Sequence, residues 1–272
     1  MKNDGLSKER KIIEHIEETF GEGSIILPEL GGHISNEELN VLSTGSPTID
    51  KATGIGGFAF GKVIEILGQE ASGKTTLALS VIAQAQKKGI RCAFIDAEQA
   101  LDKKRAEAIG VDFEKLFISQ PDNGEQGLNI LDMLVAAGTV KVIVIDSVAA
   151  LTPKAEIEGE MNDANIGGMA RMMGKALRKI IAPVNKNGIM VIFINQIRSI
   201  IGGFGYGPKE TTPGGNALKF AAAMRVDMRR TGNNKSGEKL LSTNHKVTIK
   251  KNKLAPPMMV CAVKIGERGF LG

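Results

Sequence analysis

The segment from Gly68 to Thr75 constrains the possible folds of this chain most strongly, because it fits the phosphate-loop pattern G-x-x-x-x-G-K-[ST]. An apolar run predicts a strand over Val63–Leu67, directly before the loop, and a helix is predicted over Lys74–Lys88, directly after it. In this arrangement glycines allow successive backbone N–H groups to converge on an anion, and the helix N-terminus adds its positive dipole. The alternative is a glycine-rich turn that enters a helix. The strand–loop–helix context favours a nucleotide site.

The loop also suggests roles for single residues. Lys74 is expected to reach the β- and γ-phosphates of ATP, and Thr75 is expected to be a ligand of Mg²⁺. The rest of the predicted ATP-binding loop comprises Gly68, Gln69, Glu70, Ala71, Ser72, Gly73 and Thr76. A phosphate loop alone does not distinguish a kinase, a GTPase and an ATPase, so further signals must come from the strands that follow.

Strand and helix patterns alternate along most of the chain. Strands are predicted at Val63–Leu67, Arg91–Ile95, Leu116–Ser119, Val140–Ile145, Ile189–Ile194, Arg225–Met228 and Lys246–Lys250. Helices are predicted at Lys74–Lys88, Lys103–Ala108, Glu125–Ala136, Met169–Asn187 and Ala217–Ala223. Several early strands are near-continuous runs of Val and Ile, which indicates burial on both faces of a sheet. We therefore expect an α/β fold of the P-loop NTPase class with a mostly parallel central sheet, and the last strands should form its antiparallel edge because no long helices separate them.

The N-terminal part is predicted to be a small helix–strand arm. Apolar residues at helical spacing predict a helix over residues 7–20, and Ser24–Leu27 has the character of a short strand. Residues 28–47 are polar and rich in Gly, Asn and Ser, which is typical of a linker. We place the arm at residues 1–34 and the ATPase core at residues 35–272.

The composition, with 42% hydrophobic and 24% charged residues, is typical of a globular protein with a sizeable core. No apolar run is long enough to span a bilayer and the N-terminus lacks the apolar stretch of a secretory signal, so we expect a cytoplasmic protein without a membrane partner. Cys92 and Cys261 are expected to be reduced, buried thiols. The scattered His15, His33 and His245 suggest no metal site.

Positive charge gathers in the last part of the chain. From Arg225 to Gly272 there are 11 Lys and Arg against 3 Asp and Glu, whereas the other 224 residues carry a net charge of −3. This basic quarter indicates contact with a polyanion, and a merely solvated basic face is an equally good interpretation.

Polar side chains follow three of the predicted strands, and the carboxyl ends of parallel strands are where ligands collect. Asp146 has the position of a carboxylate that holds Mg²⁺ through water, although Asp is also common in turns. Glu98 is the candidate to orient and deprotonate the attacking water, whereas Asp96 is expected to be structural. Asn195 and Gln196 place amides at a third strand end, where Gln196 can contact the γ-phosphate; capping of the strand end is the alternative.

Two segments lack a regular pattern. Residues 156–168 are first acidic and then rich in Gly, and residues 198–216 contain six glycines with aromatic residues among them. Because loops of this length without their own secondary structure are usually functional or disordered and each of these follows a core strand, we expect both to be functional.

Ten segments match a known family in the same order and over essentially all 272 residues. They are Leu42–Ser46, Gly68–Thr76, Ala93–Glu98, Ala100–Asp102, Gln120–Asp122, Gly124–Gln126, Val142–Pro153, Ala155–Glu160, Phe193–Arg198 and Thr211–Phe220. In these segments the chain resembles the bacterial and phage RecA recombinases. The resemblance implies a RecA-type core and a DNA-dependent ATPase that uses ATP and Mg²⁺. It further implies filaments on single-stranded DNA, pairing with duplex DNA, and strand exchange in homologous recombination, DNA repair and the SOS response.

The resemblance also implies roles for individual residues and partners. It makes Glu98 the base, Lys74 a catalytic phosphate ligand, Gln196 the γ-phosphate sensor and Asp146 a residue of the metal's second shell. Asp102 and Arg105 fall at the nucleotide, and the DNA-binding positions are Arg171, Arg178, Arg198, Phe204, Gly214, Gly215 and Asn216. Lys251 and Lys253 match lysines that reach the nucleotide of a neighbouring subunit, and Phe220 matches a residue that links subunits. The N-terminal arm would dock on the adjacent protomer of a helical homo-oligomer, and a self-cleaving repressor is a further candidate partner.

The chain departs from the family at several positions. Arg105 stands where the family usually has an aromatic residue that stacks on adenine, so a cation–π contact or a weaker base contact is expected. Ala221 and Ile265 also replace aromatic residues, and the chain stops at Gly272, where the family usually adds a small C-terminal domain. These changes concern nucleotide affinity and regulation more than the fold, and we expect a short, divergent member that lacks the C-terminal domain.

Two other functions remain open at the level of sequence. One is a helicase-like or repair-accessory ring motor, which closed hexamers with unwinding activity would favour. The other is a DNA-coating filament with a weak ATPase, which Arg105 and Ala221 favour and which would bind single strands without nucleotide.

Overall fold

The computed structural model describes residues 2–21, 24–25, 39–160, 167–199 and 210–271. The chain divides into two compact units, Met1–Asn40 and Val41–Gly272. The first unit contains helix α1 (Lys2–Phe20), which begins earlier than the predicted helix over residues 7–20. The predicted strand at Ser24–Leu27 is wrong in its first half, where Ser24 and Ile25 form a bend, and its second half lies outside the described residues.

The second unit contains a nine-stranded sheet with the order β13-β12-β11-β10-β3-β7-β6-β4-β5. Its strands are β3 (Val63–Gly68), β4 (Cys92–Asp96), β5 (Leu116–Ser119), β6 (Val142–Asp146), β7 (Met190–Gln196), β10 (Met224–Ser236), β11 (Lys239–Asn252), β12 (Val260–Gly266) and β13 (Gly269–Leu271). The six strands from β10 to β5 in this order are parallel, and β11, β12 and β13 extend the sheet antiparallel. The predicted parallel sheet with an antiparallel edge is confirmed, although β12 and β13 were not predicted.

Helices and two small strand pairs complete this unit. The helices are α2 (Pro47–Ala52), α3 (Lys74–Lys87), α4 (Lys103–Ile109), α5 (Gly124–Ala137), α6 (Lys154–Glu158), α7 (Gly168–Lys186) and α8 (Ala217–Ala221), with 3₁₀ turns at Phe113–Lys115 and Val148–Ala150. The small pairs are β1 (Val41–Leu42) with β2 (Phe58–Ala59) and β8 (Arg198–Ser199) with β9 (Glu210–Thr211). The linker predicted over residues 28–47 is therefore wrong at its end, where Leu42 is fully buried in the core.

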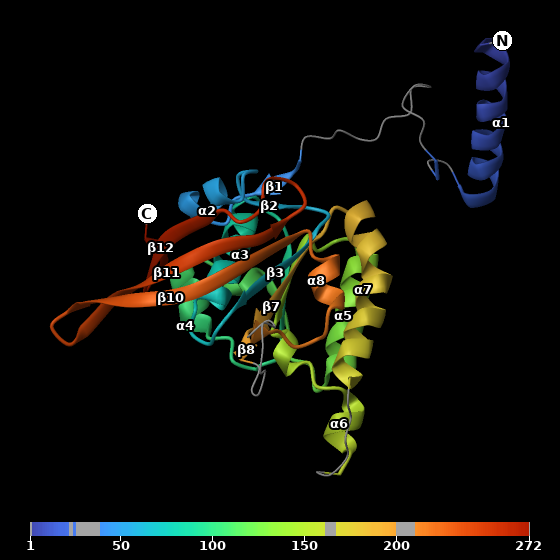
Figure 1. Ribbon diagram of the computed structural model, residues 1–272. Helices are drawn as coiled ribbons and strands as arrows, with labels where there is room; N and C mark the ends of the chain where they lie inside the picture. Colours follow the sequence, from blue (N-terminus) through green and yellow to red (C-terminus); the bar gives the residue numbers. More distant parts are fainter. Residues whose placement is uncertain (1, 22–23, 26–38, 161–166, 200–209, 272) are drawn as a thin grey trace, which may run out of the picture. The chain divides into compact units, whose positions relative to one another are not determined.

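Alternating side chains of the central strands enter two cores. On β3 and β7, Ile64, Ile66 and Ile192 pack with α2, α3 and α4, whereas Val191 and Phe193 pack with α5, α7 and α8. This period of two follows from the pleat of a strand that is buried on both faces. Figure 1 shows α5, α7 and α8 gathered on one side of the sheet, and the β10–β11 hairpin extending beyond the body of the unit.

Both cysteines are free, with Cys92 buried on β4 and Cys261 half-buried on β12. Within the described ranges, no helix combines the length and the apolar character needed to cross a membrane.

Candidate nucleotide site

The phosphate loop and three other strand ends meet at one edge of the sheet. The strand register pairs Gly68 at the end of β3 with Gln196 at the end of β7, and Asp96 at the end of β4 with Asp146 at the end of β6. Because these strands are parallel, the residues that follow them emerge on the same side. The strand-end residues predicted to act together are therefore brought together.

The phosphate loop needs its glycines for conformation and for space. Gly73 precedes α3 with φ of 89°, in the left-handed region, and a Cβ added there would lie 2.5 Å from Cδ1 of Ile265. A Cβ on Gly68 would lie 2.3 Å from the carbonyl oxygen of Met228 on β10. The loop thus rests directly on neighbouring strands, which leaves its N–H groups for an anion at the N-terminus of α3.

Lys74 folds over this loop. Its ammonium donates to the carbonyl oxygen of Gln69 at 2.7 Å, and its side chain is 8% exposed. Burial lowers the pKa of Lys74, and the carboxylates of Asp146, Glu98 and Glu70 oppose that shift. The lysine is therefore held where an added negative charge would be stabilised, as the binding of a triphosphate requires.

Thr75 and Asp146 form the predicted Mg²⁺ position. Thr75 Oγ1 donates to Asp146 Oδ2 at 2.6 Å. Burial raises the pKa of Asp146 to about 6, with the hydrogen bond from Thr75 lowering it and Glu98 raising it. Among the described residues no group of three or more His, Cys, Asp and Glu side chains could hold a metal by itself. This arrangement fits Mg²⁺, which usually binds through one or two protein oxygens together with water and substrate phosphate.

Glu98 lies at the centre of a small polar network. Its Oε1 accepts a hydrogen bond from Ser147 Oγ and another from Gln196 Nε2, the latter at 3.2 Å. The peptide bond between Asp146 and Ser147 is cis. Sequence reasoning assigned no role to Ser147, although its position directly after a metal-binding candidate was a usable signal. One oxygen of Glu98 is thus held by residues that follow β6 and end β7.

Asp96 holds the turn that carries Glu98. It is 1% exposed and accepts hydrogen bonds from the N–H groups of Ala100 and Leu101 and from Gln120 Nε2, at 3.0 to 3.2 Å. These contacts agree with the structural role expected for Asp96.

A pocket of about 280 Å³ opens beside the loop. Its lining comprises Ala71, Ser72, Gly73, Lys74, Thr75, Thr76, Arg105, Thr243, His245 and Ile265. Arg105 donates to the carbonyl oxygens of Gly266 (3.0 Å) and Glu267, which ties α4 to the turn between β12 and β13. Asp102 caps α4 by accepting from the N–H groups of Lys104 and Arg105. A larger cavity of about 570 Å³ lies at the β5 edge and contains none of the predicted nucleotide residues.

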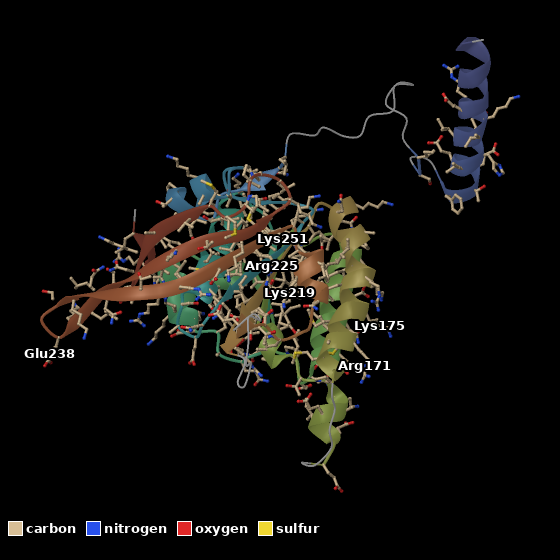
Figure 2. The ribbon with its side chains drawn as sticks, viewed as in Figure 1. Arg171, Lys175, Lys219, Arg225, Glu238 and Lys251 are labelled. Carbon is tan, nitrogen blue, oxygen red and sulfur yellow. The ribbon has the colours of Figure 1, made fainter. Side chains whose placement is uncertain are left out.

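The residues predicted to act across a subunit boundary form a second group. The Lys251 ammonium donates to the carbonyl oxygens of Lys219 (2.7 Å) and Phe220 (3.1 Å), and Lys253 donates to Phe220 at 3.5 Å. Burial lowers the pKa of Lys251, and the nearby charges of Lys253 and Arg225 lower it further. Figure 2 shows Lys219, Arg225 and Lys251 close together. The Phe220 side chain is 74% exposed, and none of these residues lines the 280 Å³ pocket of the same chain.

The predicted DNA-binding residues lie mainly on α7 and before α8. Arg171 and Arg178 are exposed on α7, and Figure 2 shows Arg171 and Lys175 on its outer side. Gly214 and Gly215 have positive φ and pack closely on Val148 and Ala170, where an added Cβ would lie 2.9 Å from each side chain.

Three further DNA-binding candidates lie elsewhere. Asn216 precedes α8, and Arg198 lies on β8; Phe204 is outside the described residues. The two segments predicted to be irregular are partly regular, because α6 covers residues 154–158 and β8 pairs with β9.

Known proteins share this sequence and this arrangement. The family model for the RecA N-terminal domain matches residues 8–267. The chain belongs to the RecA family. It is 54% identical to Protein RecA of Rhizobium rhizogenes and 56% identical to Protein RecA of Agrobacterium fabrum, in each case over 90% of this chain and 67% of the relative. A crystal structure of the RadB recombinase aligns with a TM-score of 0.65, covering 85% of this chain and 98% of that chain at 22% identity, which supports the fold.

Membership of the RecA family makes this chain an ATP-dependent recombination and repair protein, and it does not favour the ring motor or the filament with a weak ATPase. The chain spans about two thirds of the length of these RecA relatives. Thr243 and His245 of this RecA-family chain were not predicted at the site, because they come from β11 and belong to no local motif.

Proposed function

We propose that this chain is a DNA-dependent ATPase that assembles on single-stranded DNA and exchanges strands with a homologous duplex. The observation that carries the proposal is the hydrogen bond from Gln196 to Glu98. It connects the residue best placed to activate water with the strand end from which residues 198–216 depart.

In the hydrolytic step, Glu98 would orient the attacking water and accept its proton. Ser147 and Gln196 hold one oxygen of Glu98, which leaves the other oxygen for the water. Lys74 and the N–H groups of the phosphate loop would stabilise the charge on the transferred phosphoryl group, and Thr75 with Asp146 would hold Mg²⁺. When bound, Mg²⁺ would neutralise charge on the β- and γ-phosphates.

Two contacts would carry the state of the nucleotide to DNA. Gln196 is the last residue of β7, and its neighbour Asn195 is fully buried and donates to Glu65 and to the carbonyl oxygen of Pro213. A change in the partner of Gln196 would therefore reach both ends of the segment 198–216. Such ordering by a γ-phosphate contact is a known type of switch.

DNA contact would occur through backbone phosphates. α7 contains no acidic residue, and its exposed Arg171, Lys175 and Arg178 recur at the spacing of one helix face. The close packing of Gly214 and Gly215 on the residues around α7 supports a main-chain contribution beside this face. Contact with phosphates suits a protein that must accept any sequence.

Assembly would use two further parts of the chain. Lys251 and Lys253, grouped around the exposed Phe220, would reach the nucleotide of the next subunit. Residues 1–34 would be the oligomerisation arm, since Ile12 and Phe20 of α1 are exposed apolar side chains that a neighbouring protomer could cover.

The deciding experiment is ATP turnover with and without single-stranded DNA over a series of salt concentrations. We expect DNA to stimulate turnover, and salt to abolish the stimulation before it abolishes basal turnover, because phosphate contacts weaken as salt rises. Turnover that DNA leaves unchanged at every salt concentration would contradict the proposal.

A further inference from the structure

His245 is a buried polar residue directly beneath the phosphate loop. It lies on β11, where its neighbours at alternate positions, Val247 and Ile249, belong to the apolar core packed on α3. Its side chain is 2% exposed, yet it lines the pocket beside the loop. The ring carbon Cε1 lies 3.5 Å from the position that a Cβ of Gly73 would occupy.

Only one side of this imidazole is satisfied. Nε2 lies 2.7 Å from Thr243 Oγ1, and the same hydroxyl also lies 3.4 Å from the carbonyl oxygen of Ile265. Nδ1 is buried and has no hydrogen-bond partner among the described residues. The main chain of Ser72 raises the pKa of the ring, as a carbonyl oxygen that faces a ring N–H does, although no hydrogen bond between them is formed.

The surroundings of His245 favour the neutral imidazole over the charged one. Burial lowers the pKa of His245, the charge of Arg230 lowers it further, and the main chain of Ser72 only partly opposes these effects. A neutral imidazole has one N–H. Either Nε2 donates to Thr243, whose hydroxyl then donates to the Ile265 carbonyl, and Nδ1 is a bare acceptor, or the Thr243 hydroxyl turns from Ile265 to Nε2 and Nδ1 carries the proton toward Ser72. The choice between these tautomers depends on how strongly the Ser72 carbonyl accepts.

The Ser72 carbonyl and the Gly73 N–H belong to one planar peptide group and point in opposite directions. An anion that accepts from the Gly73 N–H would polarise this group and make the Ser72 carbonyl a better acceptor, because hydrogen bonds in a chain strengthen one another. A phosphate bound to the Gly73 N–H therefore favours the tautomer of His245 in which Nδ1–H donates to the Ser72 carbonyl.

We propose that His245 is a positioning residue for the phosphate loop: when phosphate binds the loop, Nδ1–H of the neutral imidazole donates to the Ser72 carbonyl and fixes the Ser72–Gly73 peptide. This inference rests on the proposed nucleotide binding. It assigns to β11 a part in organising the loop, through a residue that touches neither the reacting phosphate nor the metal ligands.

The direct test is the imidazole spectrum of the full chain labelled with ¹⁵N, recorded without nucleotide and with Mg-ADP. The chain has three histidines, and His245→Asn identifies the signals that belong to position 245. We expect Nδ1 of His245 to become the protonated nitrogen when ADP binds. An unchanged tautomer in a chain that binds ADP overturns this inference and leaves the proposed function intact, whereas a chain that does not bind ADP overturns both.

A pair of variants provides the second test. The amide of Asn reaches the position of Nδ1, and the amide of Gln reaches the position of Nε2. We therefore expect His245→Asn to bind ADP like the parent, and His245→Gln to bind about fivefold more weakly, the worth of one hydrogen bond. Equal ADP affinity of the two variants would overturn the inference. Thermal unfolding without nucleotide checks that both variants fold, and if His245→Gln does not fold, the spectrum of the parent chain decides alone.

Discussion

The side-chain amide of Gln196 donates a hydrogen bond to Oε1 of Glu98 across 3.2 Å, although the two residues are 98 positions apart in the chain. Gln196 ends β7, and Glu98 follows β4, two strands away in the sheet. A glutamine can exchange this partner for a phosphate oxygen at little cost, because its amide offers both donors and an acceptor. The pair thus links the proposed catalytic base to the strand end that precedes the DNA-binding candidates.

Replacement of Glu98 by Gln should separate nucleotide binding from hydrolysis. Gln keeps the size of the side chain but cannot accept a proton, so we expect ATP turnover to fall by roughly 10²- to 10⁴-fold. Equilibrium binding of ATP should stay close to that of the parent. Phosphate release and nucleotide titration measure the two effects, with Glu114→Gln at an exposed distant site as the control. Turnover at the parent rate in Glu98→Gln would mean that another group is the base.

Replacement of Gln196 by Ala should uncouple nucleotide from DNA. The variant keeps Lys74, Thr75 and Glu98, so ATP should still bind. In this variant ATP should no longer increase the affinity for single-stranded DNA. In coupled systems such an increase is typically about 5- to 150-fold. DNA titrations with and without a slowly hydrolysed ATP analogue measure this gain. Gln126→Ala, at an exposed position on α5, should retain it, and a full gain in Gln196→Ala would refute the coupling role.

Asp146 should make the stability of the nucleotide-free protein depend on pH. Its pKa rises from 3.8 to about 6 on folding, mainly because it is buried, so the folded protein holds a proton that the unfolded chain has lost between these values. This contribution to stability is complete below pH 3.8 and is lost as the pH rises through about 6. At pH 7.5 the ionised carboxylate therefore costs stability, on the order of 1–3 kcal/mol.

The variant Asp146→Asn removes that cost. Without Mg²⁺ and nucleotide, we expect it to unfold at higher denaturant concentration than the parent at pH 7.5, with a smaller difference at pH 5. Denaturant unfolding at the two pH values measures the effect. Glu238→Gln, at the exposed tip of the β10–β11 hairpin (Figure 2), should show no such trend.

Local pattern was sufficient to predict most of the sheet, but not the elements that depend on distant partners. Runs of Val and Ile marked β3, β6 and β7, because these strands are buried on both faces. β10 was predicted only as far as Met228, since its continuation is polar and is held by the ladder with β11 rather than by burial. β12 was missed because two of its three exposed positions carry apolar residues, Val260 and Ala262, so that its alternating burial does not show as an apolar–polar alternation in the sequence.

In the site, too, residues of local motifs could be predicted, whereas a residue placed by a distant strand could not. Lys74, Glu98, Asp146 and Gln196 could be predicted because each lies on the loop or at the end of a recognisable strand. His245 could not, because its place in the pocket depends on the antiparallel turn of β11 beside β10, which no local spacing reveals.

Arg105 offers a way to test the base contact separately from the phosphate contact. Two N–H groups of its guanidinium donate to carbonyl oxygens of the β12–β13 turn, which fixes the plane of the group at the pocket wall and leaves its flat face for a base. We expect Arg105→Ala to weaken ADP binding by roughly 2- to 30-fold, the range of a cation–π contact. Binding of inorganic tripolyphosphate, which has no base, should be unchanged.

Two further variants make this prediction specific. Arg105→Tyr restores a flat stacking surface and should recover ADP affinity. Arg105→Lys keeps a cation but loses the two carbonyl contacts that hold the guanidinium in place, so it should recover the affinity only in part. Lys104→Ala, at the exposed neighbouring position, serves as the control. If tripolyphosphate weakens as much as ADP in Arg105→Ala, the arginine supports the loop and does not contact the base.

Lys175 should contribute one phosphate contact to DNA binding. It lies between Arg171 and Arg178 on the outer face of α7, and no acidic residue of this helix competes for its ammonium (Figure 2). The logarithm of single-strand affinity falls linearly with the logarithm of salt concentration, with a slope of about 0.7 for each phosphate neutralised. We therefore expect Lys175→Gln to reduce that slope by about 0.7 and to weaken binding to every DNA sequence alike.

Lys179 is the matched control on the same helix. Its ammonium lies 2.5 Å from Asp132 Oδ2 on α5, so Lys179→Gln should leave the salt slope unchanged. Fluorescence titrations of oligothymidine between about 50 and 200 mM salt give both slopes. If the salt slopes of Lys175→Gln and Lys179→Gln both equal that of the parent, the phosphate backbone does not follow this face of α7. The exposed cations there would then contact only water. If the salt slope falls by the same amount in both variants, Asp132 does not hold Lys179 in solution. The DNA contact then extends over the side of α7 that faces α5.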